Sequence, residues 1–293
     1  MAKARALVKR RKAVVNIRKI TRTMQLIATA RFQKTMTRAQ ATRPYAEKIT
    51  ELVQELSAAG EQIRHPLLAE NPAAERSALL VVTSNRGLCG GYNSSLLRLA
   101  EEQLRAAEAA GHSADLSVLG KKGVAYFRFL KREMARAVTD LPDMPAFSDS
   151  EPFAEDFMAR YAAGQYAAVH VIYMRFVSVA RQVPTCIRLL PVRPEQRETE
   201  TAPAAAGVAQ YDFSPGPVEL LAELLPVTVK VRLFQCLTDA AVSEQVARMV
   251  AMKAATDAAD EMNKLLTRQY NRARQSQITN ELLDILGGAE ALQ

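Results

Sequence analysis

Hydrophobic side chains in the first sixty residues recur at the spacing of one helix face. The intervals are four, three, four and three residues, at Ala13, Ile17, Ile20, Met24 and Ile27. This repeat is typical of the seam of a coiled coil. Residues 1–59 also contain no glycine and a single proline, Pro44. The pattern therefore predicts one long helix over residues 1–59.

The last third of the chain has a matching pattern. No glycine or proline occurs in residues 227–286. Small and apolar side chains repeat there at helical spacing, at Ala247, Ala251, Ala254, Ala258, Met262, Leu265, Ile278, Leu282 and Ile285. We expect a C-terminal coiled-coil helix within residues 217–293, uninterrupted from just after Pro226 and ending at a Gly287-Gly288 cap. Because lone helices with apolar seams are unstable in water, the two long helices should pair antiparallel.

The chain between these helices alternates between strand-like and helix-like stretches. Short apolar runs occur at residues 78–84, 116–120, 167–178 and 183–192, and helical stretches at 94–110 and 151–163. This alternation is typical of an α/β domain with a mainly parallel sheet. We expect a Rossmann-like α/β domain at residues 75–193, flanked by the antiparallel coiled coil. Residues 194–216, rich in Pro, Ala, Glu and Thr, should form a linker or variable loop.

The charge is distributed unevenly along the chain. The formal net charge is +8, and residues 1–43 hold thirteen Lys or Arg and no Asp or Glu. The remaining residues hold 26 of the 39 basic side chains and all 31 acidic ones, a net charge of about −5. The sequence is therefore a basic helix attached to a mildly acidic body, which excludes a uniformly basic protein.

The basic helix needs a partner of opposite charge. Nucleic acid is one candidate, which makes a basic coiled-coil nucleic-acid-binding protein the alternative interpretation. Phe32 is the one aromatic side chain within residues 1–43, so base stacking is poorly served. An acidic protein surface suits a paired helix with outward-facing charges better.

Membrane spans and disulfides are not expected. No run of 18 apolar residues occurs, and the longest apolar stretch, 169–180, is interrupted by Arg175. The cysteines are Cys89, Cys186 and Cys236, an odd number that fits a reducing compartment.

The segment Ser84–Asn93 follows a strand and precedes a helix, the usual place of a phosphate-binding loop. Its glycines match neither the P-loop nor the G-x-G-x-x-G spacing. We interpret Gly87, Cys89, Gly90 and Gly91 as a tight structural turn, with a dinucleotide-dependent enzyme as a further alternative.

Other catalytic or metal-binding groupings are weak. The histidines His65, His112 and His170 lie on separate elements without ligand spacing. The acidic residues Asp140, Asp143, Asp149 and Glu151 lie in a proline-containing loop, where solvated carboxylates are more common than an acid/base pair. We expect no catalytic residues, no metal and no cofactor.

Several segments together resemble the gamma subunit of F-type ATP synthases. They are NIRKITRTMQLI (16–27), RPYA (43–46), NRGLCGGYN (85–93), SEQVARMVAMKAATD (243–257) and YNRARQSQITNELLDILGG (270–288). They span both termini and the central turn in the order of the family.

The resemblance implies a non-catalytic rotor, the central stalk, that couples transmembrane ion flow to ATP synthesis or hydrolysis. Its implied partners are the alpha and beta subunits of the catalytic ring, the epsilon subunit and the c-subunit ring, with no nucleic acid and no membrane span of its own. The implied location is peripheral, on the cytoplasmic face of the bacterial inner membrane.

The resemblance also implies contacts with the beta subunit. Arg22 and Met24 match a segment that meets an acidic loop of beta, although the family more often has Lys-Ala-Met where this chain has Arg22-Thr23-Met24. Arg274, Gln275 and Thr279 match positions that engage a second loop of beta. Independently, Arg268, Arg272, Gln275 and Thr279 share one helix face by their spacing.

Overall fold

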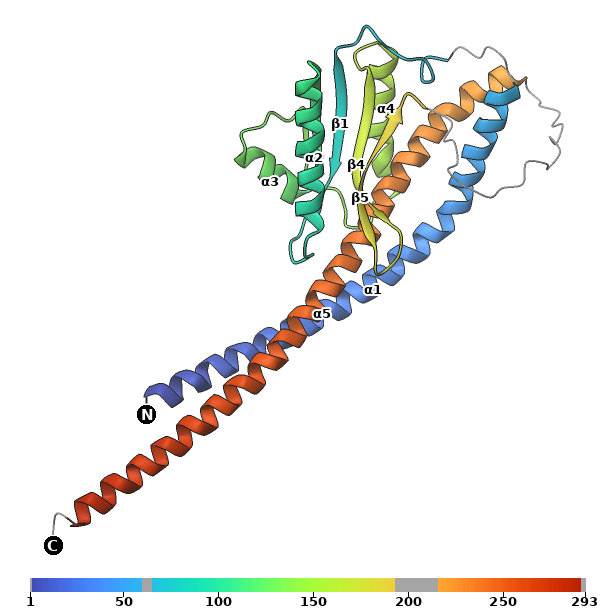
Figure 1. Cartoon of the computed structure of the whole chain (residues 1–293). Coiled ribbons are helices and arrows are strands. Elements are labelled where there is room, and N and C mark those ends of the chain that lie inside the picture. The colour runs from blue at the N-terminus through green and yellow to red at the C-terminus, as the bar shows by residue number, and fades with distance from the viewer. Residues whose placement is uncertain (1, 60–64, 193–215, 291–293) are drawn as a thin grey trace. The chain divides into compact units, whose positions relative to one another are not determined.

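The computed structural model describes residues 2–59, 65–192 and 216–290 (Figure 1). Its elements in chain order are α1 (Ala2–Ala59), β1 (Arg76–Val82), α2 (Tyr92–Ala109), β2 (Ser113–Leu119), α3 (Lys121–Phe129), β3 (Arg136–Val138), α4 (Phe147–Ala162), β4 (Ala168–Phe176), β5 (Gln182–Leu190) and α5 (Pro217–Glu290). The expected fold class, two long terminal helices and a central α/β domain, is confirmed.

The chain divides into two compact units. One unit comprises Met1–Arg31, Leu88–Gly90 and Ala247–Gln293, and the other comprises Phe32–Gly87 and Gly91–Val246. Both long helices therefore contribute one part to each unit.

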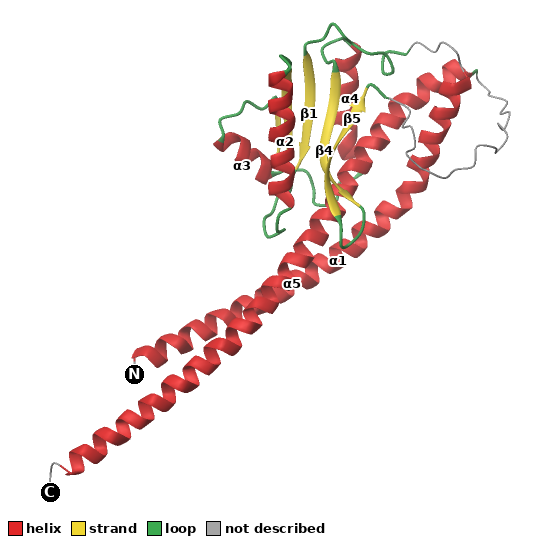
Figure 2. Ribbon diagram, in the orientation of Figure 1, coloured by secondary structure: helices red, strands yellow, loops and turns green. Residues whose placement is uncertain are grey.

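The second unit contains a five-stranded sheet with the order β3-β2-β1-β4-β5, of which Figure 2 labels β1, β4 and β5. The strands β1, β2, β3 and β4 are parallel, and β5 pairs antiparallel with β4. The connection from β1 to β2 leads one way along the sheet, whereas β4 lies on the other side of β1. This reversal is the switch point of a doubly wound α/β fold.

The main core of this unit lies on the face of the sheet that α4 and the first part of α5 cover. Leu80 and Val82 of β1 contribute to it, together with Phe157 of α4 and Leu225 of α5. Because successive side chains of a strand point to opposite faces, Leu79 and Val81 face the side of the sheet where α2 lies (Figure 1). The sheet is thus buried on both faces, as its apolar runs predict.

The long helix α5 begins earlier and ends later than the sequence suggested. It starts at Pro217, passes through Pro226 and continues through Gly287 and Gly288 to Glu290. An interior proline costs a helix about 3 kcal/mol. Here Leu221, Leu225 and Val229 around it are fully buried, and their burial stabilises the helix by more than that cost. The expected break after Pro226 and the cap at Gly287-Gly288 were both wrong.

Two elements of the sheet domain were not anticipated, α3 and β3. Helix α3 contains Gly123 and follows Gly120, residues that lower helix propensity. Both glycines are required by close packing, because a Cβ at Gly120 would overlap the carbonyl oxygen of Thr83, and one at Gly123 would lie 2.6 Å from the Thr83 hydroxyl. The strand β3 has three residues, too few for a pattern. The expected linker, residues 194–216, lies outside the described residues except for Gly216.

Candidate functional site

The first unit consists mainly of two antiparallel helical segments, residues 2–31 of α1 and 247–290 of α5. The Arg11 guanidinium lies over the Tyr270 ring, 5.6 Å from its centroid, and Thr256 donates a hydrogen bond to Thr21. Residue numbers fall on α5 as they rise on α1, which defines the antiparallel pairing. The expected coiled coil is therefore present.

The buried seam of this pair is not the one that the hydrophobic pattern predicted. On α1 a set of buried or half-buried positions follows the expected four-three repeat shifted by one residue, at Leu7, Arg11, Val14, Thr21, Gln25 and Ala28, and of the predicted seam Met24 is half-buried. The predicted seam residues Ile17, Ile20 and Ile27 are each at least half exposed. The helical period was right and its phase was wrong, because polar and small side chains occupy the contact face.

The same shift occurs on α5. The side chains on its contact face are Met252, Thr256, Ala259, Asn263, Leu266 and Tyr270, whereas the predicted Ala254, Ala258, Met262 and Leu265 are exposed. Charged groups also join the two segments, since Arg18 Nε lies 2.5 Å from Asp260 Oδ1. The seam thus combines small, polar and apolar side chains with a charged pair beside it.

The apolar side chains that were predicted to lie in the seam are exposed on the surface of the helix pair. Ile17, Ile20 and Ile27 on α1 and Met262 and Leu265 on α5 are exposed, and the exposed Arg10, Lys12, Lys19 and Arg22 lie along the same segment of α1. Exposed apolar side chains in such numbers are typical of surfaces that bind another protein. The basic charge indicates that this partner is acidic.

The residues expected to contact the beta subunit lie in two groups on this unit. Arg22 is exposed and donates to Gln25 Oε1 at 3.2 Å, and Met24 is half-buried. The second group is exposed on α5, and it consists of Arg268, Arg272, Arg274, Gln275 and Thr279. Because Thr256 is the residue beside Thr21, Arg22 lies opposite about position 255. Arg268 and Thr279 are therefore about 13 and 24 residues, roughly 20 and 36 Å, farther along the pair. The two groups are thus separate along the helices and do not converge on one site.

The turn after β1 is held by side-chain hydrogen bonds. Asn93 Oδ1 accepts from the Ser84 amide at 3.0 Å, and Asn85 bridges the Lys121 amide and the Leu141 carbonyl at 3.1 and 2.8 Å. Cys89 is buried, so its thiol is poorly placed to act as a nucleophile.

The glycines of this turn have different environments. Gly90 has φ +57°, the left-handed region that favours glycine, and a Cβ there would lie 3.8 Å from Ala251 Cβ. Gly87 lies against the Lys122 side chain, and the Gly91 carbonyl accepts from the Ser95 amide at 3.0 Å. These contacts position the start of α2.

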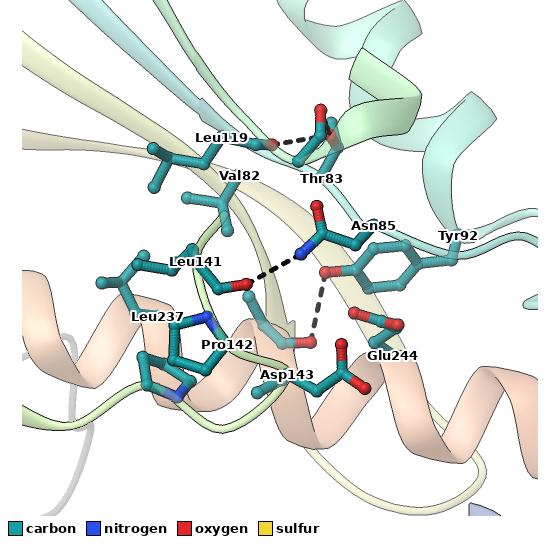
Figure 3. Close-up of a pocket in the computed structure, with 14 residues that line it drawn as sticks. Val82, Thr83, Asn85, Tyr92, Leu119, Leu141, Pro142, Asp143, Leu237 and Glu244 are labelled. Atoms are coloured by element: carbon teal, nitrogen blue, oxygen red, sulfur yellow. Dashed lines mark hydrogen bonds between the residues drawn. The ribbon is translucent and has the colours of Figure 1, made fainter. Parts of the chain in front are cut away.

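A small pocket lies beyond the carboxyl ends of β1 and β2 (Figure 3). Ligands of doubly wound folds bind at such strand ends. Here Leu141 and Pro142 of one loop and Leu237 and Glu244 of α5 fill the space, and Tyr92 donates a hydrogen bond to the Ala240 carbonyl. The remaining volume is about 40 Å³, whereas small-molecule sites usually measure about 300–1,000 Å³. The chain's own side chains thus occupy the place where a dinucleotide would bind.

The structure places Asp149 and Glu151 in helix α4 and not in a loop as expected, and they and Asp143 make structural contacts. Asp149 Oδ2 accepts from the Ala146 amide at the start of α4, and Glu151 pairs with Lys230 of α5 at 3.3 Å. Asp143 lies 3.8 Å from Arg86. Within the described ranges no three His, Cys, Asp or Glu side chains are grouped as metal ligands.

The histidines are likewise separate. Burial lowers the pKa of His65, and burial followed by the nearby Arg188 guanidinium lowers the pKa of His170. His112 is exposed at the end of α2. They share no site.

Comparison with known proteins identifies the family. A family model described as ATP synthase matches residues 3–292. The ATP synthase gamma chain of Rhodopirellula baltica is 45% identical over 295 residues, which cover all of both chains. The chain belongs to the ATP synthase gamma-chain family. The gamma chain of Frankia casuarinae is 42% identical over 288 residues, covering 97% of this chain and 96% of its own. As a gamma chain, the protein is a subunit of an ATP synthase.

Chains of solved ATP synthase structures have a similar fold. A chain in the mitochondrial ATP synthase of Euglena gracilis has a TM-score of 0.67 at 17% identity, covering 99% of this chain and 95% of that one. A chain in the central stalk and c-ring structure of Tetrahymena thermophila ATP synthase has a TM-score of 0.57 at 20% identity, covering 80% of this chain and 99% of that one. At this identity the likeness shows a shared fold.

Among the helices that the structure describes in this gamma-chain family member, none has the length and apolar character needed to span a membrane.

Several features of the helix pair and of the strand ends of the sheet were not predicted from the sequence. They are the polar seam with Thr21 and Thr256, the contact of Arg11 with Tyr270 and the glycine at position 120. The seam had a usable signal, because a second four-three repeat, one residue out of phase, runs through the same segment. This second repeat is a weaker hydrophobic signal because its members are less apolar.

Proposed function

We propose that the chain is the rotor of the central stalk, turning inside a ring of alpha and beta subunits and coupling transmembrane ion flow to ATP synthesis or hydrolysis. The observation that carries this proposal is the full-length match to gamma chains. It is supported by the similar chain in the central stalk and c-ring structure of Tetrahymena thermophila ATP synthase. The nucleic-acid-binding alternative has no such support.

The proposed mechanism is coupling by differential contact. A stalk whose faces differ presents a different surface to each catalytic subunit as it turns, and each surface stabilises a different nucleotide-binding conformation. The exposed isoleucines of α1 and the basic side chains beside them would supply apolar and charged contacts on one side of the helix pair. The gamma chain itself would perform no bond-making step.

The contact residues follow from the same proposal. Arg22 and Met24 would meet one acidic loop of beta, and Arg268, Arg272, Arg274, Gln275 and Thr279 would meet another. All of them except the half-buried Met24 are exposed, which supports this assignment because exposed side chains can reach a partner. Two contact regions separated by about 20 Å or more along the helices suit two different loops of the ring.

The proposed assembly also includes the epsilon subunit and the c-subunit ring, and it places the chain peripherally on the cytoplasmic face of a bacterial inner membrane. The test is reconstitution of the complex in vesicles with and without this chain. We expect ion-driven ATP synthesis only when the chain is present. ATP synthesis that persists at the same rate without the chain would refute the rotor function.

A further inference from the structure

A larger cavity lies in the second unit, between α1, the sheet and α5. It measures about 340 Å³ and is lined by residues 36–42 of α1, 173–176 of β4, Ile187 of β5 and 232–242 of α5. All of these residues belong to the same compact unit. Its volume is within the range of small-molecule sites, about 300–1,000 Å³, and it is distinct from the small pocket beside β1 and β2.

The charges lining this α1–β4–α5 cavity favour an anion. Two guanidinium groups, those of Arg175 and Arg232, face one carboxylate, that of Asp239. Arg232 and Asp239 each already interact with other groups of the chain. The exposed Arg175 is therefore the cation best placed to meet a ligand. Guanidinium groups bind carboxylate, sulfonate and phosphate oxygens with paired hydrogen bonds.

The neutral groups of the lining support the same ligand chemistry. Tyr173 is buried, and burial raises the pKa of its phenol, which therefore stays protonated and is hydrogen-bonded to the Cys236 thiol. Burial also raises the pKa of the Cys236 thiol to about 12, so this group adds no negative charge. Apolar wall is provided by Met36, Phe176 and Val242. Polar donors on one side and apolar side chains on another are typical of sites for amphiphilic small molecules.

We propose that the α1–β4–α5 cavity binds a small organic anion, with its acidic group at Arg175 and its apolar part against Met36 and Phe176. Such a ligand would contact both long helices and the sheet together. The site is separate from the exposed helix surfaces proposed to meet the beta subunit.

The experiment uses the full chain and the aromatic sulfonate 1-anilinonaphthalene-8-sulfonate, whose fluorescence rises in apolar surroundings. We expect saturable binding to one site. Arg175→Gln should weaken it about tenfold, since a hydrogen bond to a charged group is lost. The matched control is Arg181→Gln, which removes an exposed charge at the adjacent β4–β5 turn and should leave the dissociation constant unchanged.

Two further variants separate site loss from misfolding. Ala39→Phe should fill the cavity and abolish the saturable signal, with helical circular dichroism confirming the fold. Gln40→Glu, at an exposed position of the lining, adds a carboxylate without changing size and should weaken binding about threefold or more. Equal dissociation constants for Arg175→Gln, Gln40→Glu and Arg181→Gln would overturn the proposal, as would saturable binding by a folded Ala39→Phe chain.

Discussion

The hydrogen bond between Thr21 and Thr256 gives a measurable test of the polar seam. Their Oγ1 atoms are 2.8 Å apart, and the residues are 9% and 6% exposed. Such a bond contributes about 0.5–1.5 kcal/mol net. After Thr256→Val, Thr21 can still donate to the Arg18 carbonyl, and after Thr21→Val, Thr256 can still donate to the Met252 carbonyl. Each single substitution should therefore lower the free energy of unfolding by about 1 kcal/mol.

The double substitution should also cost about 1 kcal/mol, since the same bond is lost once. The assay is urea unfolding of the full chain, followed by helical circular dichroism, for the parent, both single variants and the double variant. Thr23→Val is the matched control, because its exposed hydroxyl bonds to the Lys19 carbonyl of its own helix. It should change stability by less than about 0.5 kcal/mol. Single effects that add within about 0.3 kcal/mol would show that the two hydroxyls do not interact and would refute this account of the seam.

Three further predictions follow from other parts of the chain. Gly120→Ala should lower the free energy of unfolding, measured in urea, by about 3 kcal/mol or more. Gly111→Ala is also at positive φ but has open space around it, so it should lower that free energy by only about 1 kcal/mol. Similar losses for the two variants would contradict the overlap between a Cβ at position 120 and the Thr83 carbonyl oxygen. Burial lowers the pKa of His170 in the folded state below 6.5. The contribution of the neutral imidazole to the free energy of unfolding is therefore complete above about pH 6.5, and it is lost as the pH falls below that value. His170→Gln should therefore show a smaller decrease in urea midpoint between about pH 7.5 and 5.5, and an unchanged decrease would exclude this role. Arg272→Ala should slow ATP hydrolysis by the assembled complex about fivefold, the equivalent of about 1 kcal/mol of contact, while the exposed Arg128→Ala leaves it unchanged; equal rates would remove Arg272 from the proposed beta contacts.

The exposed face of α5 and the turn after β1 differ in how much of each could be predicted from the sequence. The exposed basic and polar side chains of α5 were placed on one face by spacing alone, and Arg268, Arg272, Gln275 and Thr279 are all exposed. The turn after β1 was located by its glycines. Their spacing does not show that Leu141, Pro142 and α5 fill the adjacent strand ends, since those residues are at least fifty positions away in the chain.

The missed helix α3 shows why local patterns fail in this domain. Gly123 weakens the helix signal by about 1 kcal/mol relative to alanine. It is there because the Thr83 hydroxyl and the Val118 side chain leave no room for a Cβ. Its amide also donates to the Thr83 hydroxyl at 2.9 Å. Gly123 is thus required by a contact distant in sequence, and the same glycine weakens the local pattern that would predict helix α3.

The sequence by itself determined the two long helices, the alternation of strands and helices between them and the basic charge of the first helix. Each of these depends on neighbours within a few residues, which periodicity and composition record directly. Only the tertiary structure decided which face of each long helix is buried. The more apolar face of α1, with Ile17 and Ile20, remains exposed, while Val14, Thr21 and Ala28 lie in the seam. Burial depends on which surface the other helix can approach closely, and hydrophobicity along one helix carries no information about that fit.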